Sequence, residues 1–463
     1  MRFYRIFSFV FSLMMVLGFG AGPLGRAEAA GPSLIRDAEV EAVLRDLSTP
    51  VFEAAGLHPQ NIRIFIVQDS SLNAFVAGGQ NIFFHTGLLT KAKRADEVIG
   101  VIAHEVGHIS GGHLARTQDQ LDKLSTPQIL TYVLGTATAL LLGSPEVGFA
   151  ILSGGAQLTL QNFLQYTRTQ ERSADAAAIT ILDRLKLSPQ GLYDFLNTLS
   201  ISNQWREEGS PYMRTHPTDT ERLHFLEKAI AQSPYRDKRS SPRQDEQLAF
   251  VRGKLAGFLT AESDLKTLSA PDKNTLDTRY AQAIGDYRQH LVDQGRAGIQ
   301  ALLKSYPWHV YLYDTMGQLE AMNGQEEKSF AAYQKAYQTL PFDALIRLSL
   351  GNSYVNRAKK ETNETKKQDL YRNAEEHLGF VAQKEPYNAI AWRSLSIAQA
   401  GLGKKGLAEL SLAEIALLNN DLKQADIHIQ RAALTLKQGD DGWIKLQDLR
   451  QAQKTAKDEK KSL

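Results

Sequence analysis

Two histidines and a glutamate stand within five residues in the segment His104-Glu105-Val106-Gly107-His108. Apolar residues over 98–102 predict that the segment is helical. Helical residues four positions apart lie on one side, a turn apart, so His104 and His108 can bind one metal ion. Glu105 lies on the neighbouring flank, where its carboxylate can take a proton from an attacking water molecule. The motif predicts a zinc-dependent hydrolase.

A zinc site of this kind needs a third protein ligand. His113 is nine positions past His104, which turns it to the opposite side of a helix, so it is predicted to be a helix-end or surface histidine. Glu171 is the better candidate, because it opens an apolar helical run and shares a face with Asp175. Glu171 can complete a His-His-Glu site, and Asp175 can orient a ligand imidazole by accepting its free N–H. Taken alone, this segment would be an ordinary acidic first turn of a helix.

Composition restricts both the metal ligands and the partners. The 463 residues include no cysteine, so a metal has to be bound by histidine and carboxylate side chains. The net charge of +2, with no long basic run before the C-terminal tail, gives no reason to predict nucleic-acid binding. The length predicts two or three domains.

The first 29 residues have the pattern of a cleavable secretory signal. Arg2 and Arg5 precede the apolar stretch Ile6–Phe19, and small residues lead to Ala27-Glu28-Ala29. A basic start, a short apolar core and an A-x-A site are typical of export signals. We expect cleavage after Ala29. The alternative is a membrane anchor, for which the apolar core is short.

The residues around the motif predict a small sheet beside helices. Apolar spacing over Ser33–Leu47 predicts a helix, and Asn61–Val67 alternates as a strand does. Asn73–Phe84 predicts two strands joined by a turn at Gly78-Gly79. A helical region from Thr86 then leads into the motif. Further on, Leu124–Thr167 has one charged residue and predicts a buried or lid-like hairpin, with membrane contact as the alternative.

The C-terminal half of the sequence contains a repeated pattern. Pro307, Pro341 and Pro386 are 34 and then 45 residues apart, and small or aromatic residues recur at fixed distances after each proline. A period of 34 with this pattern is typical of tetratricopeptide repeats. The longer unit fits the same register with an insertion near Lys359–Gln368. The residues in phase are Tyr313, Arg347 and Trp392 at six past each proline, and Gly317, Gly351 and Ser396 at ten past.

These patterns together predict an α+β, mostly α, chain. A zincin-type metallopeptidase domain is followed by an α-solenoid of tetratricopeptide repeats. The expected segments are a signal peptide at 1–29, a peptidase domain at 30–235, a linker at 236–250, repeats at 251–452 and a disordered tail at 453–463.

Three segments in this order resemble the HtpX-like gluzincin metallopeptidases, the family that includes the CAAX prenyl proteases. They are HEVGH at 104–108, ERSAD at 171–175 and the HP-x4-R pattern of His216, Pro217 and Arg222. NAFVAGGQNIFFHTGLL at 73–89 is similar to the strand pair before the family's catalytic helix. The signal peptide and the repeats narrow the resemblance to the BepA-like periplasmic branch.

The resemblance implies a set of site residues. His104, His108 and Glu171 would bind one Zn²⁺ per chain, with Glu105 as the catalytic base and Asp175 as a second catalytic carboxylate.

It also implies roles for the third segment. In BepA-like proteins the histidine that matches His216 can approach the zinc from a loop and hold the enzyme inactive, so His216 is a further candidate ligand. Arg222 would lie near the active site.

The implied function is a periplasmic zinc endopeptidase of protein quality control. Its substrates would be unfolded or misassembled outer-membrane proteins, and its repeats would contact the outer-membrane assembly machinery. Residues 124–167 could add peripheral membrane contact. The alternative is a chaperone or assembly adaptor that acts through the repeats and has only latent proteolysis. A membrane-bound peptidase is a third, weaker hypothesis.

Overall fold

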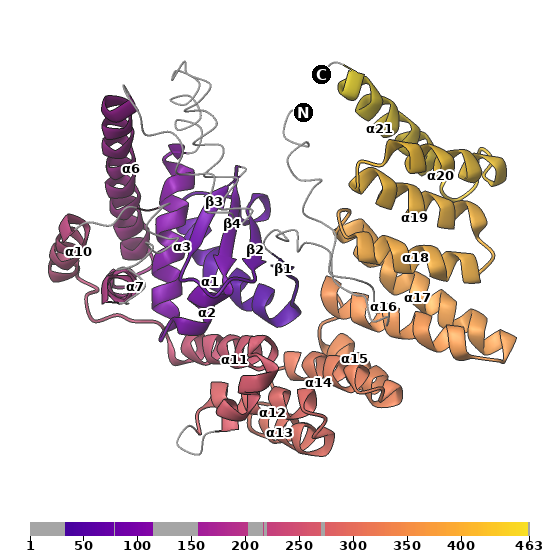
Figure 1. The fold of residues 1–463 in the computed structure, drawn as a ribbon, viewed down its shortest axis with the longest axis horizontal. Helices are drawn as coiled ribbons and strands as arrows, with labels where there is room; N and C mark the ends of the chain where they lie inside the picture. Colours follow the sequence, from indigo (N-terminus) through magenta and orange to yellow (C-terminus); the bar gives the residue numbers. More distant parts are fainter. Residues whose placement is uncertain are drawn as a thin grey trace, which may run out of the picture. The chain divides into compact units, whose positions relative to one another are not determined.

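The computed structural model describes residues 33–77, 79–113, 156–201, 216, 220–269 and 274–461. The chain divides between Gly285 and Asp286 into two compact units (Figure 1). The predicted signal peptide and residues 124–155 of the predicted hairpin lie outside the described residues. Among the helices that the structure describes, none combines the length and the apolar character needed to cross a membrane.

A small mixed sheet organises the N-terminal unit. Its strands lie in the order β1-β2-β4-β3, with β2 and β4 parallel and the two outer pairs antiparallel. The predicted strand pair with a glycine turn is present as β3 and β4, and Gly79 in the turn has a φ of +95°. The strands are β1 (Leu34–Ile35), β2 (Arg63–Val67), β3 (Ala74–Ala77) and β4 (Asn81–His85).

The predicted helix over Ser33–Leu47 is correct only in part. Leu34 and Ile35 pair with Val67 and Ile66 of β2 instead, because their apolar side chains suit a strand as well as a helix. The helix begins after Asp37, whose carboxylate accepts hydrogen bonds from the first free backbone N–H groups.

Helices pack around the sheet and enclose one core. α3 contacts α1, α6, α7 and strand β3, so it lies at the centre of the unit (Figure 1). The core side chains come from both sides of α3 and from one face of the sheet. The helices are α1 (Ala38–Ala54), α2 (Thr86–Lys91), α3 (Ala95–Ser110), α6 (Ala156–Arg184), α7 (Gln190–Ile201), α10 (Thr220–Gln232) and α11 (Pro242–Leu259), with short 3₁₀ turns at η3 (Pro59–Asn61) and η5 (Glu262–Ser269).

Helix α11 begins inside the stretch expected to be a linker, 236–250. The Ser241 side chain accepts a hydrogen bond from the Gln244 backbone N–H, and the Gln244 side-chain oxygen accepts one from the Ser241 backbone N–H. Pro242 takes the first helical position. This reciprocal cap is a helix-start signal, which the charge and proline content of the stretch concealed.

The C-terminal unit is a succession of antiparallel helices. Neighbouring helices along the chain contact one another, as expected for stacked helical repeats. α21 continues to Lys461, whereas the sequence predicted a disordered tail from 453. The helices are α12 (Leu276–Arg288), which spans the boundary, and α13 (Val292–Ser305), α14 (Tyr311–Met322), α15 (Glu326–Thr339), α16 (Ala344–Lys360), α17 (Glu364–Lys384), α18 (Ala389–Gly401), α19 (Lys405–Leu418), α20 (Leu422–Thr435) and α21 (Trp443–Lys461).

The structure explains two phases of the repeat. Six residues past the proline, Arg347 Nε donates to the Pro341 carbonyl (2.7 Å) and Trp392 Nε1 donates to the Pro386 carbonyl (2.8 Å). Different residue types therefore close the same turn, because each supplies an N–H donor. Ten residues past, a Cβ on Gly317 would lie 2.5 Å from the Tyr333 ring, so only glycine allows the helices to approach there.

Candidate metal centre

Helix α3 presents His104, Glu105 and His108 to the interior. All three side chains are buried, with His104 and Glu105 fully so. The Nε2 atoms of the two histidines are 3.2 Å apart, so both rings point to the same place. The i, i+4 spacing of the sequence motif therefore produces the arrangement that was predicted for it.

Helix α6 supplies a carboxylate to the same place. Glu171 Oε2 lies 3.2 Å from His104 Nε2, and Oε1 lies 3.3 Å from His108 Nε2. The two helices come close because of Gly107, where a Cβ would be only 2.7 Å from the Ala174 carbonyl oxygen. The glycine inside the motif thus has a packing role.

His216, between α7 and α10, completes the cluster. Its Nδ1 lies 3.2 Å from Glu171 Oε1 and 3.4 Å from His104 Nε2. One ligand atom from each of His104, His108, Glu171 and His216 falls within 4.8 Å of the others, and all four residues are buried. Three nitrogens and a carboxylate oxygen that converge in this way can hold a metal ion.

A second group of residues surrounds the ligand atoms. Asp175, one helical turn after Glu171, places Oδ1 2.9 Å from His104 Nδ1, on the side of the ring away from the cluster. Arg222 at the start of α10 donates to both oxygens of Asp175 (2.7 and 2.8 Å), and its Nη1 lies 2.9 Å from Glu171 Oε2. Arg222 therefore fixes two carboxylates that face different sides of the site.

Charges in the cluster favour a cation. Burial alone would lower the pKa of His104, but the carboxylates of Asp175 and Glu171 raise it to about 9. Burial lowers the pKa of His108 to about 3, so this ring is neutral and offers a lone pair. Burial opposes ionisation of Glu171, yet His216 and the other two histidines hold its pKa well below the ordinary value. The site therefore combines an ionised Glu171 carboxylate with the neutral nitrogen of His108.

The pKa of Glu105 is shifted in the opposite direction to that of Glu171. Burial raises the pKa of its carboxyl group, which makes it a better proton acceptor than an exposed glutamate. Neither carboxylate oxygen has a hydrogen-bond partner among the described residues, and His216 Nε2 lies 3.4 Å from Oε1. A buried carboxylate with this lack of partners is suited to receive a proton from a bound molecule.

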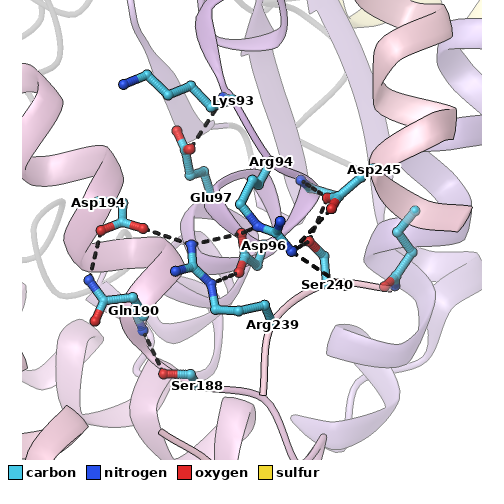
Figure 2. A network of polar contacts seen from close by, with 12 residues as sticks. Lys93, Arg94, Asp96, Glu97, Ser188, Gln190, Asp194, Arg239, Ser240 and Asp245 are labelled. Atoms are coloured by element: carbon cyan, nitrogen blue, oxygen red, sulfur yellow. Dashed lines mark hydrogen bonds and ion pairs between the residues drawn. The ribbon is translucent and has the colours of Figure 1, made fainter. Parts of the chain in front are cut away.

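The start of α3 is fastened from two directions (Figure 2). Arg239 donates to the buried carboxylate of Asp96 and, through Nη2, to Asp194 of α7 (2.7 Å). Asp245 of α11 accepts a hydrogen bond from the Ala95 backbone N–H (2.9 Å) and so caps α3 from a distant part of the chain. These contacts hold the helix that carries the motif in place along its axis.

One histidine, His113, does not lie where the sequence predicted. His113 is at the end of α3 as expected, but the expectation of a surface position is wrong, because its side chain is 4% exposed. Its Nδ1 lies 2.9 Å from Nδ1 of His108. Helical geometry alone put it on the wrong side, since the chain leaves the helix before this residue. The Gly111-Gly112 pair was the available signal for that change of direction.

Comparisons with known proteins agree with this site. Residues 35–230 match the sequence profile described as Peptidase family M48. The chain is 26% identical over 337 residues to the beta-barrel assembly-enhancing protease of Yersinia pestis. The aligned region covers 71% of this chain and 68% of that protein. It is 23% identical over 333 residues to the protein of the same name from Escherichia coli (strain K12), and this alignment covers 70% of the chain and 66% of the relative. Metalloprotease YcaL of the same strain is 25% identical over 174 residues, 37% of this chain and 63% of the relative.

The matched region contains every residue of the cluster, and the resemblance drawn from the sequence motifs is confirmed. Residues 35–230 therefore form a peptidase family M48 domain, and the chain is a metalloendopeptidase related to the proteins named beta-barrel assembly-enhancing protease.

Proposed function

We propose that this metalloendopeptidase uses one zinc ion per chain and degrades misassembled outer-membrane proteins in the periplasm. The observation that carries the proposal is the convergence of His104, His108 and Glu171 beside the buried carboxylate of Glu105. The export-type pattern of the first 29 residues supports the location, and the names of the related beta-barrel assembly-enhancing proteases support the substrates.

The spacing of the ligand atoms supports zinc. Ligands at about 2.0–2.2 Å from a tetrahedral zinc ion lie about 3.3–3.6 Å from one another. The contacts that join Nε2 of His104, Nε2 of His108, Nδ1 of His216 and the two oxygens of Glu171 measure 3.2, 3.2, 3.3, 3.2 and 3.4 Å. Little rearrangement is needed to accept such an ion, and the absence of cysteine from the sequence leaves these nitrogen and oxygen donors as the available ligands.

A bound zinc ion would supply a Lewis acid that polarises the peptide carbonyl and favours ionisation of water. The chain's own groups do the rest. Glu105 accepts the proton of the attacking water and delivers it to the departing amine. Asp175 and Arg222 keep His104 and Glu171 in position while charge changes nearby.

We propose that His216 keeps the enzyme latent. Its ring completes the ligand set and contacts Glu105, so it occupies the space that water and substrate need. His216 has to move away before a peptide reaches Glu105. The same observation favours the second candidate function, an assembly adaptor or chaperone that acts through its repeats while proteolysis stays latent.

Zinc content and a single substitution test the proposal. Purified protein should contain about one zinc per chain, and Glu105→Gln should retain the metal while losing cleavage of an unfolded protein such as casein. Protein without stoichiometric zinc would contradict the metal assignment.

A second measurement separates the two candidate functions. Wild-type protein and Glu105→Gln are compared for rescue of an outer-membrane assembly defect in cells that lack the protein. Better rescue by the wild type supports the peptidase, whereas equal rescue supports the adaptor.

A further inference from the structure

Helix α3 ends in a turn that only glycine allows. Gly112 has a φ of +62°, in the left-handed region that residues with a side chain rarely adopt. A Cβ on Gly111 would lie 2.4 Å from Nε2 of His113. The glycine pair therefore lets the chain reverse and leaves space for the His113 ring against the end of the helix.

The reversal directs His113 toward a ligand of the metal centre. Nδ1 of His113 is 2.9 Å from Nδ1 of His108, and the two rings meet edge to face, with centroids 5.0 Å apart. The backbone of His113 is held as well, because Gln170 Nε2 donates to its carbonyl oxygen (3.3 Å). Gln170 directly precedes Glu171, so the ligand from α6 and the His113 turn are fixed together.

The direction of the hydrogen bond between His108 and His113 follows from the contacts of the other ring nitrogen of His108. Nε2 of His108 faces His104 and Glu171, so a metal ion would take the Nε2 lone pair. A neutral imidazole that binds through Nε2 carries its proton on Nδ1. His108 then donates and His113 accepts.

We propose that His113 is a positioning residue for the metal centre, which accepts the Nδ1–H of His108 and fixes the rotation of that ring. Asp175 has the equivalent position beside His104, since both lie 2.9 Å from the Nδ1 atom of a ligand histidine. Each histidine of the motif thus has its own acceptor, an aspartate for one and a neutral imidazole for the other. This inference rests on the proposed function, in which His108 binds zinc.

A matched pair of substitutions tests the role. His113→Leu introduces an apolar side chain of similar size and removes the acceptor nitrogen. His113→Asn can place an amide oxygen near the position of Nδ1. Zinc affinity is measured by competition with a chelator in the full-length protein. Loss of such an outer hydrogen bond lowers metal affinity by about 10–100-fold. We expect that loss for His113→Leu and a much smaller one for His113→Asn.

Two further measurements separate positioning from packing. The melting temperatures of the zinc-free proteins should be similar for the Leu and Asn variants. The visible spectrum of the cobalt-substituted protein should change only in His113→Leu. His224→Leu is the control, because His224 is exposed on α10, and its zinc affinity should equal that of the wild type. If His113→Leu does not fold, Gly111→Ala displaces the same ring and should weaken zinc binding.

The outcomes are distinguishable. Wild-type affinity in His113→Leu, or equal losses in the Leu and Asn variants, would overturn the positioning role and leave the proposed function intact. A wild-type protein that takes up no stoichiometric zinc would overturn both.

Discussion

Arg222 donates two hydrogen bonds to Asp175, from Nε at 2.7 Å and from Nη2 at 2.8 Å, and both side chains are buried. Asp175 in turn lies 2.9 Å from Nδ1 of His104, on the side of that ring away from the cluster. Burial would raise the pKa of Asp175, but the charge of Arg222 and the contact with His104 outweigh burial and lower this pKa to about 2. A residue of α10 thus determines the ionisation of a carboxylate on α6.

Removal of Arg222 should destabilise the N-terminal unit and its metal site together. Arg222→Ala leaves Asp175 and Glu171 buried without the guanidinium that contacts both, which costs about 3–5 kcal/mol in unfolding free energy. Arg222→Lys should lose less, because the charge remains but the two-pronged geometry does not. Chemical denaturation measures both. The control is Arg172→Ala, whose exposed pair with Glu221 should contribute under about 1 kcal/mol. Equal effects for Arg172→Ala and Arg222→Ala would contradict this account.

Gly107 should not tolerate a methyl group. Gly107→Ala places a Cβ 2.7 Å from the Ala174 carbonyl oxygen, so α3 and α6 must separate, at about 1–3 kcal/mol. Activity should fall with stability, because Glu171 moves with α6. Gly379→Ala on α17 is the matched control, since its Cβ would meet nothing within 4 Å. There the gain in helix propensity should stabilise by up to about 1 kcal/mol. A stabilised Gly107→Ala protein would refute the close helix contact.

The fastening at the start of α3 predicts a cost for Arg239→Ala. Asp96 would stay buried, and of the ion pairs that the described residues make with it, only the longer contact to Arg94 (3.6 Å) would remain. Because Arg239 is itself partly exposed, we expect about 2 kcal/mol rather than the full value for a buried pair. Thermal unfolding checks this. Arg236→Ala, which removes an exposed arginine three residues earlier, should leave the melting temperature unchanged.

His377 predicts an acid-sensitive repeat unit. It is buried between the rings of Tyr337 and Tyr354, and burial, followed by the charge of Arg347, lowers its pKa below the ordinary 6.5. The folded state therefore excludes a proton that the unfolded state binds below pH 6.5. The stability from this group is complete above pH 6.5 and falls by up to about 1.4 kcal/mol per pH unit below it.

A substitution isolates this effect. His377→Phe keeps an aromatic ring between the two tyrosines and removes the titrating group. Melting temperatures measured from pH 8 to pH 5 should fall less steeply for His377→Phe than for the wild type. An unchanged slope would assign the pH dependence to other groups.

His216→Ala should cleave casein, or itself, faster than the wild type does. The substitution opens the space beside Glu105 that His216 Nε2 now borders at 3.4 Å. Zinc should remain bound through the three other ligands, although more weakly. The measurements are the cleavage rate and the zinc content of the same preparation. An unchanged or slower rate, with zinc retained, would remove the latency proposal.

Much of the site was predictable because it depends on local geometry. Histidines at 104 and 108 share a helix face through a spacing that the backbone itself sets, and the same holds for Glu171 and Asp175 one turn apart. The strand pair β3–β4 and the repeat period followed from alternation and from recurring prolines. In each case the determining residues lie within a few tens of positions of one another.

The sequence was less informative where one segment fitted two kinds of structure. Leu34 and Ile35 fit a helix by spacing, and only pairing with β2 made them a strand. The stretch before α11 looked like a linker, although it contains a reciprocal helix cap and contacts that fasten α3.

By itself, the sequence determined the donor set, the face of each helix that carries it and the repeat architecture, because these depend on residue types and short spacings. Tertiary structure alone decided that Arg222 would contact Asp175, that Arg239 would contact Asp96, and that His113 would turn back to His108. Those contacts join groups on separate elements, or on either side of a glycine turn, and their distances depend on how closely whole helices pack.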